Sequence, residues 1–536
     1  MKKTAFRWLA LCLALVFALT GCEPLLPQLT NPETEPQIVA FADMEYTRQD
    51  VAELENLSQA IYDSIEAGED VPTLMEKVFA FYEAYNHYYT AYALANIHYS
   101  KDVTNSQWEE EYTYCLETSS NVDALLDNLL YALADHPERE ALEAEEYFGE
   151  GFFDSYEGES IWDETFTALS NQEAELQARY YEVSGKAANV SSYSEGFYMT
   201  YGAQLADIYV ELVKVRQEMA EYAGYEDFAS FAYAFYFSRD YTPGQAMQLM
   251  ADIEQLLVPL YLTVDYTPLY DLFRKECKEA DTFNYVQSCA KNMGGVMEEA
   301  FNLMHTAGLY DITYSTKKYD ASFEMYLMDY NQPYVFVNPT KMVYDKLTFT
   351  HEFGHFCNDY AAQGSNVGID VAEFFSQGLE YLSLDYATGG QSLTGLKMVD
   401  SLCLYVEQTA YSVFEHEVYQ LKGDELTREN VYAIYKDVGN RFGFAGSGWD
   451  YRSFVLVPHF FISPMYIISY VVSNDAAMQL YQLEQSQKGA GLSKYTENLA
   501  TTEYQFLGFI QAAGLESPFD PGRIQKVRQT FLETMQ

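Results

Sequence analysis

Two histidines and a glutamate within five residues have the types and spacing of a metal site. Residues 351–355 are His-Glu-Phe-Gly-His, so on a helix His351 and His355 lie one turn apart on the same face. Two imidazoles placed this way can bind one zinc ion, and Glu352 beside them can take a proton from a zinc-bound water. The chain has only 8 histidines, which makes a chance pairing uncommon. The alternative interpretation is a surface helix that carries two histidines without a metal.

Two histidines leave a catalytic zinc site one protein ligand short, because such a site normally has three and a water. A third histidine six residues after the second is excluded, since that position is Ala361. Glu373 and Glu380 are seven residues apart and share one face of the next predicted helix, with Gln377 between them. Glu373 has a second interpretation, since Asp370 and Glu373 also resemble a capping box. The residues alone leave both interpretations open.

Helices dominate the predicted secondary structure. From about Met44 to Ala307 the spacing of apolar residues is helical throughout. Further on, the segment 345–362 is predicted to be a helix that ends at Gly364, and the segment 370–387 is predicted to be a second helix. The short loop between these two helices can bring their polar faces together.

A small β-hairpin is expected just before the histidine helix. The segments 322–328 and 333–338 are rich in strand-forming residues, and residues 329–332 between them are typical of a turn.

The second helix carries a resemblance to a known family. Residues 373–380 look like the Glu-x-x-Ser-x-x-x-Glu helix of the thimet oligopeptidase and oligoendopeptidase F family of zinc peptidases, and His-Glu-Phe-Gly-His is that family's form of the histidine motif. The resemblance implies that Glu373 is the third zinc ligand. It implies that Glu380 orients a ligand histidine. Residues 333–338 are similar to the family's substrate-lining strand, which implies substrate binding along Tyr334, Phe336 and Asn338, by strand addition at this edge.

Residues 458–470 resemble another segment of the family, in which an imidazole and tyrosines stabilise the oxyanion of the reaction. The resemblance makes His459, Tyr466 and Tyr470 the candidates here. The alternative is core packing for the tyrosines and a satisfied core residue for His459. Two positions depart from the family. Ile468 replaces the middle tyrosine of a Tyr-x-Tyr-x-Tyr pattern, and Asn358 stands where the family often has a histidine. The resemblance covers about residues 320–520.

Composition limits the function classes. Hydrophobic residues make up 49% and charged residues 21%, which is typical of a globular protein. The formal net charge of -49 argues against a nucleic-acid partner, because phosphates would be repelled. Such an acid excess serves solubility, or it draws in cations such as metal ions and basic peptides.

The N-terminus has the pattern of a targeting segment. Lys2, Lys3 and Arg7 precede an apolar run from Trp8 to Leu19 that is short for a membrane span. The run ends in Leu-Thr-Gly-Cys, which resembles a bacterial lipoprotein signal with cleavage before Cys22 and lipid on its thiol. An ordinary secretory signal or an anchor helix is the alternative. The five cysteines after Cys22 are predicted to be buried thiols, although Cys277 and Cys289 are close enough in sequence to pair.

These patterns predict four parts of the chain: a signal peptide (1–21), a lipidated Cys22 with a flexible tether (22–45), an N-terminal helical subdomain (46–307) and a zinc-binding catalytic subdomain (308–536). The family resemblance implies a mainly α fold in which two helical subdomains flank a deep substrate channel, with a small β-hairpin or sheet next to the zinc helix.

The predicted function is a zinc-dependent metalloendopeptidase that hydrolyses oligopeptides with one zinc ion per chain. Zinc rather than manganese or cobalt follows from the ligand types and from the family. The lipid on Cys22 would hold the enzyme on the extracytoplasmic side of a bacterial membrane. Two alternatives remain: a lipoprotein receptor for peptides or solutes, which has no need of Glu352 and the histidines, and a zinc protein without catalysis.

Overall fold

Helices make up most of the computed structural model, which describes residues 38–535 apart from residues 145, 146, 157, 159, 188, 189, 191–193 and 446–448. The predicted signal peptide, Cys22 and the first part of the predicted tether lie outside the described residues. No helix in the described part of the chain combines the length and the apolar character needed to cross a bilayer. All five described cysteines are buried free thiols, so Cys277 and Cys289 are not paired.

The first part of the chain is helical, as its apolar spacing predicts. The helices are α2 (Val51–Ala67), α3 (Val71–Lys101), α4 (Ser106–Ala134), α5 (Arg139–Leu142), α6 (Glu164–Ala187), α7 (Glu195–Phe197), α8 (Ala203–Tyr222), α9 (Phe228–Phe235), α10 (Pro243–Leu256), α11 (Val258–Tyr261), α12 (Thr267–Phe273), α13 (Glu279–Met293) and α14 (Val296–Thr306).

The second part of the chain begins with a small sheet and returns to helices. Its elements are β1 (Tyr310–Asp311), β2 (Ser322–Leu327), β3 (Gln332–Val337), α15 (Asp345–Ala362), α16 (Ile369–Tyr386), α17 (Thr394–Tyr419), α18 (Arg428–Arg441), α19 (His459–Ile462), α20 (Ile468–Ser486), α21 (Ala490–Asn498), α22 (Phe506–Ala513) and α23 (Arg523–Thr534). The mainly α fold with a small sheet is therefore confirmed.

The predicted hairpin is present, and a third strand extends it. Strands β2 and β3 pair antiparallel, with Ser322 opposite Val337 and Leu327 opposite Gln332. Strand β1 pairs in parallel with β3, which gives the order β1-β3-β2. A two-residue strand has no periodicity that a sequence pattern could reveal, so β1 was not expected.

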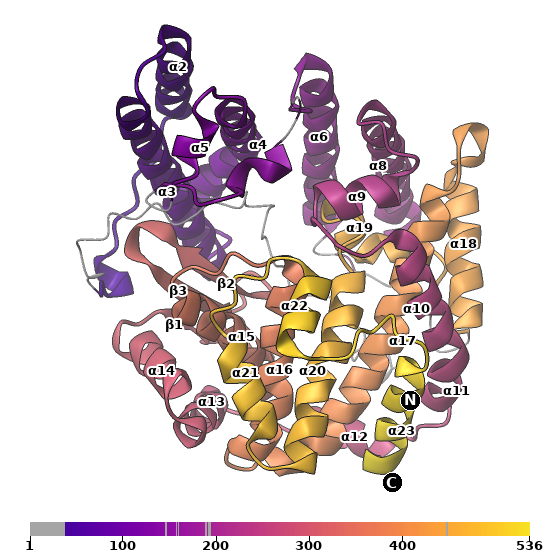
Figure 1. Ribbon diagram of the computed structural model, residues 1–536. Coiled ribbons are helices and arrows are strands. Elements are labelled where there is room, and N and C mark those ends of the chain that lie inside the picture. The colour runs from indigo at the N-terminus through magenta and orange to yellow at the C-terminus, as the bar shows by residue number, and fades with distance from the viewer. Residues whose placement is uncertain are drawn as a thin grey trace.

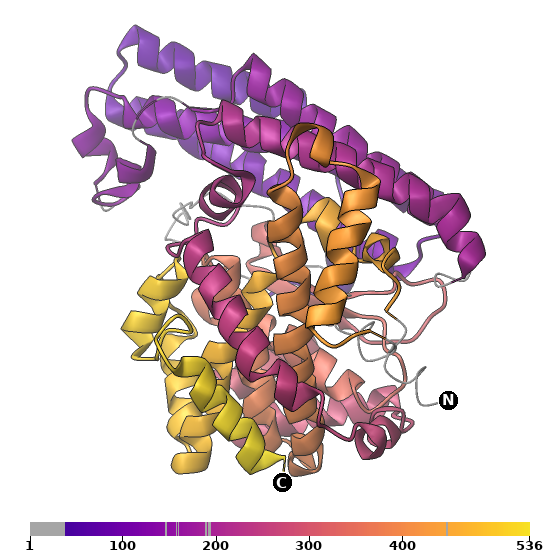
Figure 2. The same ribbon diagram turned by 90° about the vertical axis from the view of Figure 1, so that its right-hand side faces the viewer.

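Helices α2, α3 and α4 enclose a hydrophobic core of their own, at the upper left of Figure 1. Figure 2 shows the same helices at the top of the molecule. The main core contains residues on both sides of the predicted subdomain boundary between 307 and 308. Phe301 of α14 packs edge to face on Phe353 of α15, for example, with 5.7 Å between ring centroids. The main core also includes Ala93, Leu94 and Ile97 of α3, so residues from the first helices contribute to it as well.

The site depends on helices α15, α16, α17 and α20, which pack against one another in the lower body of the molecule (Figure 1). Helix α15 has the predicted bounds. Its first residue, Asp345, accepts hydrogen bonds from the backbone N–H groups of Thr340 and Met342, which fixes the loop that joins the sheet to the helix. The helix ends at Ala362, and the next residue, Gln363, adopts the left-handed conformation with φ 57°.

Candidate active site

The structure brings the three predicted zinc ligands together. His351 and His355 project from α15 and Glu373 from α16, and one ligand atom from each lies within 4.8 Å of the other two. The distance from Nε2 of His351 to Oε2 of Glu373 is 3.5 Å. Because His351 is buried and α15 packs against the sheet and α16, the alternative of an exposed surface helix is wrong.

Glu373 does not cap its helix. Helix α16 starts at Ile369 and its N-cap is Gly368, so Glu373 lies beyond the first turn. Its carboxylate instead accepts the hydroxyl of Tyr466 on Oε1 at 3.0 Å and the hydroxyl of Ser376 on Oε2 at 3.1 Å. These two bonds fix the carboxylate so that it faces the histidines, and the capping-box alternative is wrong.

Gly354, inside the histidine motif, allows this convergence. A Cβ atom at this position would lie 2.6 Å from Cα of Ser376 and 2.7 Å from the carbonyl oxygen of Phe375. Both are backbone atoms of α16, so they cannot rotate away. The absence of a side chain therefore lets α15 and α16 approach closely enough for Glu373 to reach the histidines.

Two buried polar atoms test whether a metal ion fits these residues. Nδ1 of His351 lies 2.8 Å from Oε1 of Glu380, which leaves Nε2 to face Glu373. Neither Nε2 of His351 nor Oε1 of Glu352 has a hydrogen-bond partner among the described residues, although their side chains are only 7% and 1% exposed. Buried polar atoms are nearly always satisfied. An unsatisfied imidazole nitrogen beside an imidazole and a carboxylate fits a divalent cation, with imidazole ligands suited to zinc.

Burial and neighbouring charges shift the pKa values of these groups. Burial raises the pKa of Glu352 to about 8, and the carboxylates of Glu373 and Glu380 act in the same direction. Burial lowers the pKa of His355 well below its ordinary value. Burial also opposes a charge on His351, but the hydrogen bond to Glu380 and the nearby carboxylates outweigh it and raise the pKa to about 9. A bound cation would favour the ionised carboxylates and the neutral imidazoles.

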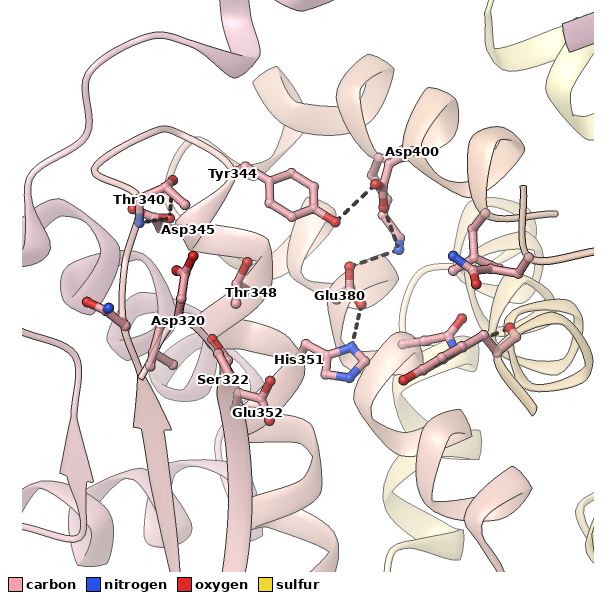
Figure 3. A pocket seen from close by; sticks show the side chains of 18 residues that line it. Asp320, Ser322, Thr340, Tyr344, Asp345, Thr348, His351, Glu352, Glu380 and Asp400 are labelled. Atoms are coloured by element: carbon pink, nitrogen blue, oxygen red, sulfur yellow. Dashed lines mark hydrogen bonds and ion pairs between the residues drawn. The ribbon is translucent and has the colours of Figure 1, made fainter. Parts of the chain in front are cut away.

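A series of buried charged side chains begins at Nδ1 of His351, on the side of the ring away from Glu373 (Figure 3). Glu380 accepts from Nζ of Lys397 at 2.8 Å, and Lys397 also lies 3.5 Å from Asp400. Asp400 in turn accepts the hydroxyl of Tyr344 at 3.0 Å. The predicted role of Glu380 agrees with this geometry, whereas Lys397 was missed. Its only signal in the sequence is a charge within a mostly apolar stretch at the start of α17.

His459, Tyr466 and Tyr470 lie together on the Glu373 side of the site. The hydroxyl of Tyr470 lies 3.4 Å from Nε2 of His459, and the rings of Tyr466 and Tyr470 have centroids 5.2 Å apart. Both tyrosines are buried, and Tyr466 contacts a predicted metal ligand directly. Ile468, which stands where the family pattern has its middle tyrosine, packs among apolar residues of the main core.

The prediction that substrate adds to β3 is wrong. Strand β3 is the central strand, paired with β1 on one side and β2 on the other, so it has no free edge at Val335 and Phe336. Tyr334 and Phe336 are both 0% exposed. Only Asn338, of the three predicted substrate-binding residues, reaches the pocket. A pattern of strand-forming residues does not reveal which neighbours a strand will have.

The pocket lies between the sheet and the helices that carry the site (Figure 3). Its lining includes Ser322 of the edge strand β2, Asn338 after β3, and His351 and Glu352 of α15. Gln377 of α16 also faces it. The Nε2 atom of Gln377 donates to the carbonyl oxygen of Tyr470 at 3.3 Å, while its buried Oε1 has no partner among the described residues. The pocket thus presents acceptor groups beside the predicted metal position.

Comparisons with known proteins identify the type of fold. Residues 41–160 match the family model described as the Peptidase M3 N-terminal domain. This range coincides with the separate core of α2–α4. A search of curated proteins finds no match.

Solved structures with the same fold include oligoendopeptidases. An oligoendopeptidase F structure matches with a TM-score of 0.79 and 19% identity over 93% of this chain and 98% of that one. PZ peptidase A with an inhibitor matches with a TM-score of 0.79 and 18% identity over 92% of this chain and 99% of that one. An oligoendopeptidase F from Bacillus anthracis str. Ames matches with a TM-score of 0.77 and 20% identity over 93% and 98% of the two chains.

The protein is therefore a helical chain with the fold of oligoendopeptidase F structures, and its His-Glu-x-x-His helix lies beside Glu373. The Peptidase M3 match and the shared fold confirm the resemblance to M3 peptidases of the oligoendopeptidase F type that the motifs predict.

Proposed function

We propose that the protein is a zinc-dependent metalloendopeptidase that hydrolyses peptide bonds in oligopeptides. The observation that supports this most directly is the convergence of His351, His355 and Glu373 beside Glu352, with buried nitrogen and oxygen atoms that no described residue satisfies. His351, His355 and Glu373 would hold one zinc ion per chain. A receptor for peptides would need none of these buried groups, and burying them without a partner would cost stability.

The chemistry divides between the ion and the protein. Zinc, when bound, would supply Lewis acidity toward a carbonyl oxygen and would lower the pKa of a water molecule. Glu352 takes the proton of the attacking water as general base and passes it to the leaving amine. His459, Tyr466 and Tyr470 are the candidates to donate hydrogen bonds to the oxygen on which negative charge develops. Glu380 holds His351 through Nδ1, so that Nε2 is presented to the ion.

Replacing Glu352 by Gln tests this proposal. The substitution keeps the shape of the side chain but removes the base, so we expect the cleavage of quenched fluorescent peptides to fall at least about 100-fold while zinc remains bound. Zinc content is measured by elemental analysis, and cleavage is measured with and without a chelator.

Three results would separate the alternatives. Chelator-sensitive cleavage by the wild type that is lost in Glu352→Gln supports the peptidase. Bound zinc without cleavage in the wild type indicates a non-catalytic zinc protein. Peptide binding with neither zinc nor cleavage indicates the receptor and overturns the proposal.

The proposal includes a lipid anchor on Cys22 that holds the protein on the extracytoplasmic side of a bacterial membrane. It rests on the basic residues near the N-terminus, the apolar run that follows and the Leu-Thr-Gly-Cys ending, all of which lie outside the described residues. This location would give the enzyme access to peptides outside the cytoplasm.

A further inference from the structure

A buried arginine from the first half of the chain holds the backbone beside His459. Arg216 of α8 donates from Nη1 to the carbonyl oxygen of Phe460 at 2.9 Å and from Nη2 to that of Phe461 at 2.5 Å. Its Nε donates to Glu173 of α6 at 2.6 Å. The side chain of Arg216 is fully buried. One guanidinium thus grips two consecutive carbonyl groups and is neutralised by one carboxylate.

A second buried arginine repeats this arrangement at the other end of the same segment. Arg239 donates from Nη1 to the carbonyl oxygen of Met465 at 2.9 Å and from Nη2 to that of Tyr466 at 3.5 Å. Nη2 also donates to the hydroxyl of Ser469 at 2.7 Å. Its Nε donates to Asp370, in the first turn of α16, at 3.2 Å. This arginine therefore ties the segment to the helix that carries Glu373.

The segment between the two arginines cannot hold its own conformation through regular structure. Helix α19 is only four residues long, and Met465 has a positive φ of 64°, which is unfavourable for a residue with a side chain. The N–H group of Met465 donates to Glu415 of α17 at 3.0 Å. Backbone groups that a helix would have satisfied internally are satisfied here by side chains from α8, from α17 and from the loop between α9 and α10.

We propose that Arg216 and Arg239 are positioning residues that hold His459 and Tyr466 in the geometry needed for catalysis. We name the two the arginine clamp. This inference rests on the proposed function, because it assigns the clamp to the groups that stabilise the oxyanion. A planar guanidinium fork suits two adjacent acceptors, which a lysine ammonium cannot match. The expected effect is on rate, since displacing a catalytic group by about 1 Å can cost about 100-fold.

The test compares Arg216→Lys and Arg239→Lys with the matched control Arg523→Lys. Arg523 of α23 is also buried, and it donates to the carboxylate of Asp475 at 2.8 Å and to the carbonyl oxygen of the same residue at 3.3 Å. Its bonds lie outside residues 458–469. All three variants replace a planar guanidinium group by an ammonium group. A purely structural effect would therefore lower the melting temperature of each variant, and kcat would not fall more in the clamp variants than in the control.

We expect the two clamp variants to lose about 10-fold or more in kcat, with KM within about twofold of wild type and unchanged zinc content. The control should keep its kcat. A phosphinic peptide, which imitates the tetrahedral transition state, should bind more weakly to the clamp variants in proportion to their loss of kcat. Hydrogen exchange of backbone amides in residues 458–470 should be faster in the clamp variants than in the control.

Two results would overturn the inference. The first is that a clamp variant has the same kcat as Arg523→Lys and the same rate of backbone amide hydrogen exchange in residues 458–470. The other is a loss of kcat that is accompanied by an equal loss of zinc. If Arg216→Lys does not fold, the same measurements are made on Arg239→Lys and on Asp370→Asn, which changes the carboxylate partner of Arg239. Failure of the proposed function itself would be distinguishable, because the wild type would then lack zinc-dependent cleavage while the exchange experiment would still report on the clamp.

Discussion

Two glutamates on one face of α16 have different roles because their neighbours differ. Glu373 points its carboxylate to the position shared with Nε2 of His351, whereas Glu380 already contacts Nδ1 of the same ring and the ammonium of Lys397. Spacing places both on one helix face, but only the contacts separate a ligand from a residue that orients a ligand.

We predict that Glu373→Ala lowers zinc affinity more than Glu380→Ala does. Removing a carboxylate that orients a ligand costs about 10- to 100-fold in metal affinity, and removing one of three ligands should cost more. Zinc affinity is measured by competition with a chromophoric chelator. Equal losses in the two variants would contradict the assignment of Glu373 as a ligand.

Glu407 of α17 carries a pH dependence that is separate from the metal site. Its Oε1 accepts the hydroxyl of Tyr261 at 3.2 Å, and its Oε2 has no hydrogen-bond partner among the described residues. Burial raises the pKa of Glu407 from 4.5 to about 8. Between these two pH values the folded protein binds the proton more tightly than the unfolded chain does, so the free energy of unfolding falls as pH rises from about 5 to 8.

We predict that Glu407→Gln removes this fall, because an amide has no proton to lose. Relative to wild type, the free energy of unfolding of the variant should rise by on the order of 3 kcal/mol between pH 5 and pH 8. Urea unfolding at the two pH values measures the free energy of unfolding of both proteins. Subtracting the wild-type value from that of the variant removes the contributions of the other titrating groups. A difference that is the same at both pH values would contradict the prediction.

The sequence predicted the residues of the site unevenly. His351, Glu352 and His355 follow from spacing within one helix, and Glu373 follows from the family resemblance. Arg216 and Arg239 were missed because their partners lie far away in sequence, and Lys397 was missed because its partner Glu380 belongs to another helix. No local pattern shows that a charged side chain will be buried with a carboxylate from another helix.

At the scale of elements, the contact between α15 and α16 determines the metal site. A helix pair of ordinary spacing would leave Glu373 too far from the histidines, and Gly354 removes the side chain that would keep the two backbones apart. This glycine is therefore required by a close approach, not by its backbone conformation.

We predict that Gly354→Ala disrupts the site, because its Cβ would lie 2.6 Å from Cα of Ser376 and must push α16 away. Zinc affinity and melting temperature should both fall. The control is Gly185→Ala in α6, where an added Cβ meets nothing within 4 Å. An exposed helical Gly→Ala change should raise stability by roughly 0.5–1 kcal/mol. Full zinc affinity in Gly354→Ala would show that the helices can separate without loss of the site.

Local sequence predicted elements better than it predicted their neighbours. The bounds of α15 are those expected, and α16 lies within one residue of the expected start and end, because residues typical of helix ends flank both helices. The hairpin was also found. The position of β3 in the middle of the sheet was not, since its parallel partner β1 comes from a segment more than twenty residues earlier in the chain.

At the scale of the whole molecule, the proposed lipid on Cys22 would hold the protein at a membrane through one residue. We predict that Cys22→Ser abolishes fatty-acid labelling and moves the full chain from the detergent phase to the aqueous phase in a bacterial host. Cys12→Ser, which changes a cysteine inside the apolar run, is the matched control and should keep both properties. A labelled Cys22→Ser protein would contradict lipidation at Cys22.

The sequence by itself determined the mainly helical character, the positions of α15 and α16, and the histidine motif, because these depend on interactions within a few turns of one helix. Only the tertiary structure decided that Glu373 faces the two histidines, that Lys397 supports Glu380, and that two arginines hold the segment with His459 and Tyr466. These contacts join residues between 17 and 245 positions apart. They form because burying charged and polar groups is costly unless each finds a partner, and only the packed chain determines which partners are within reach.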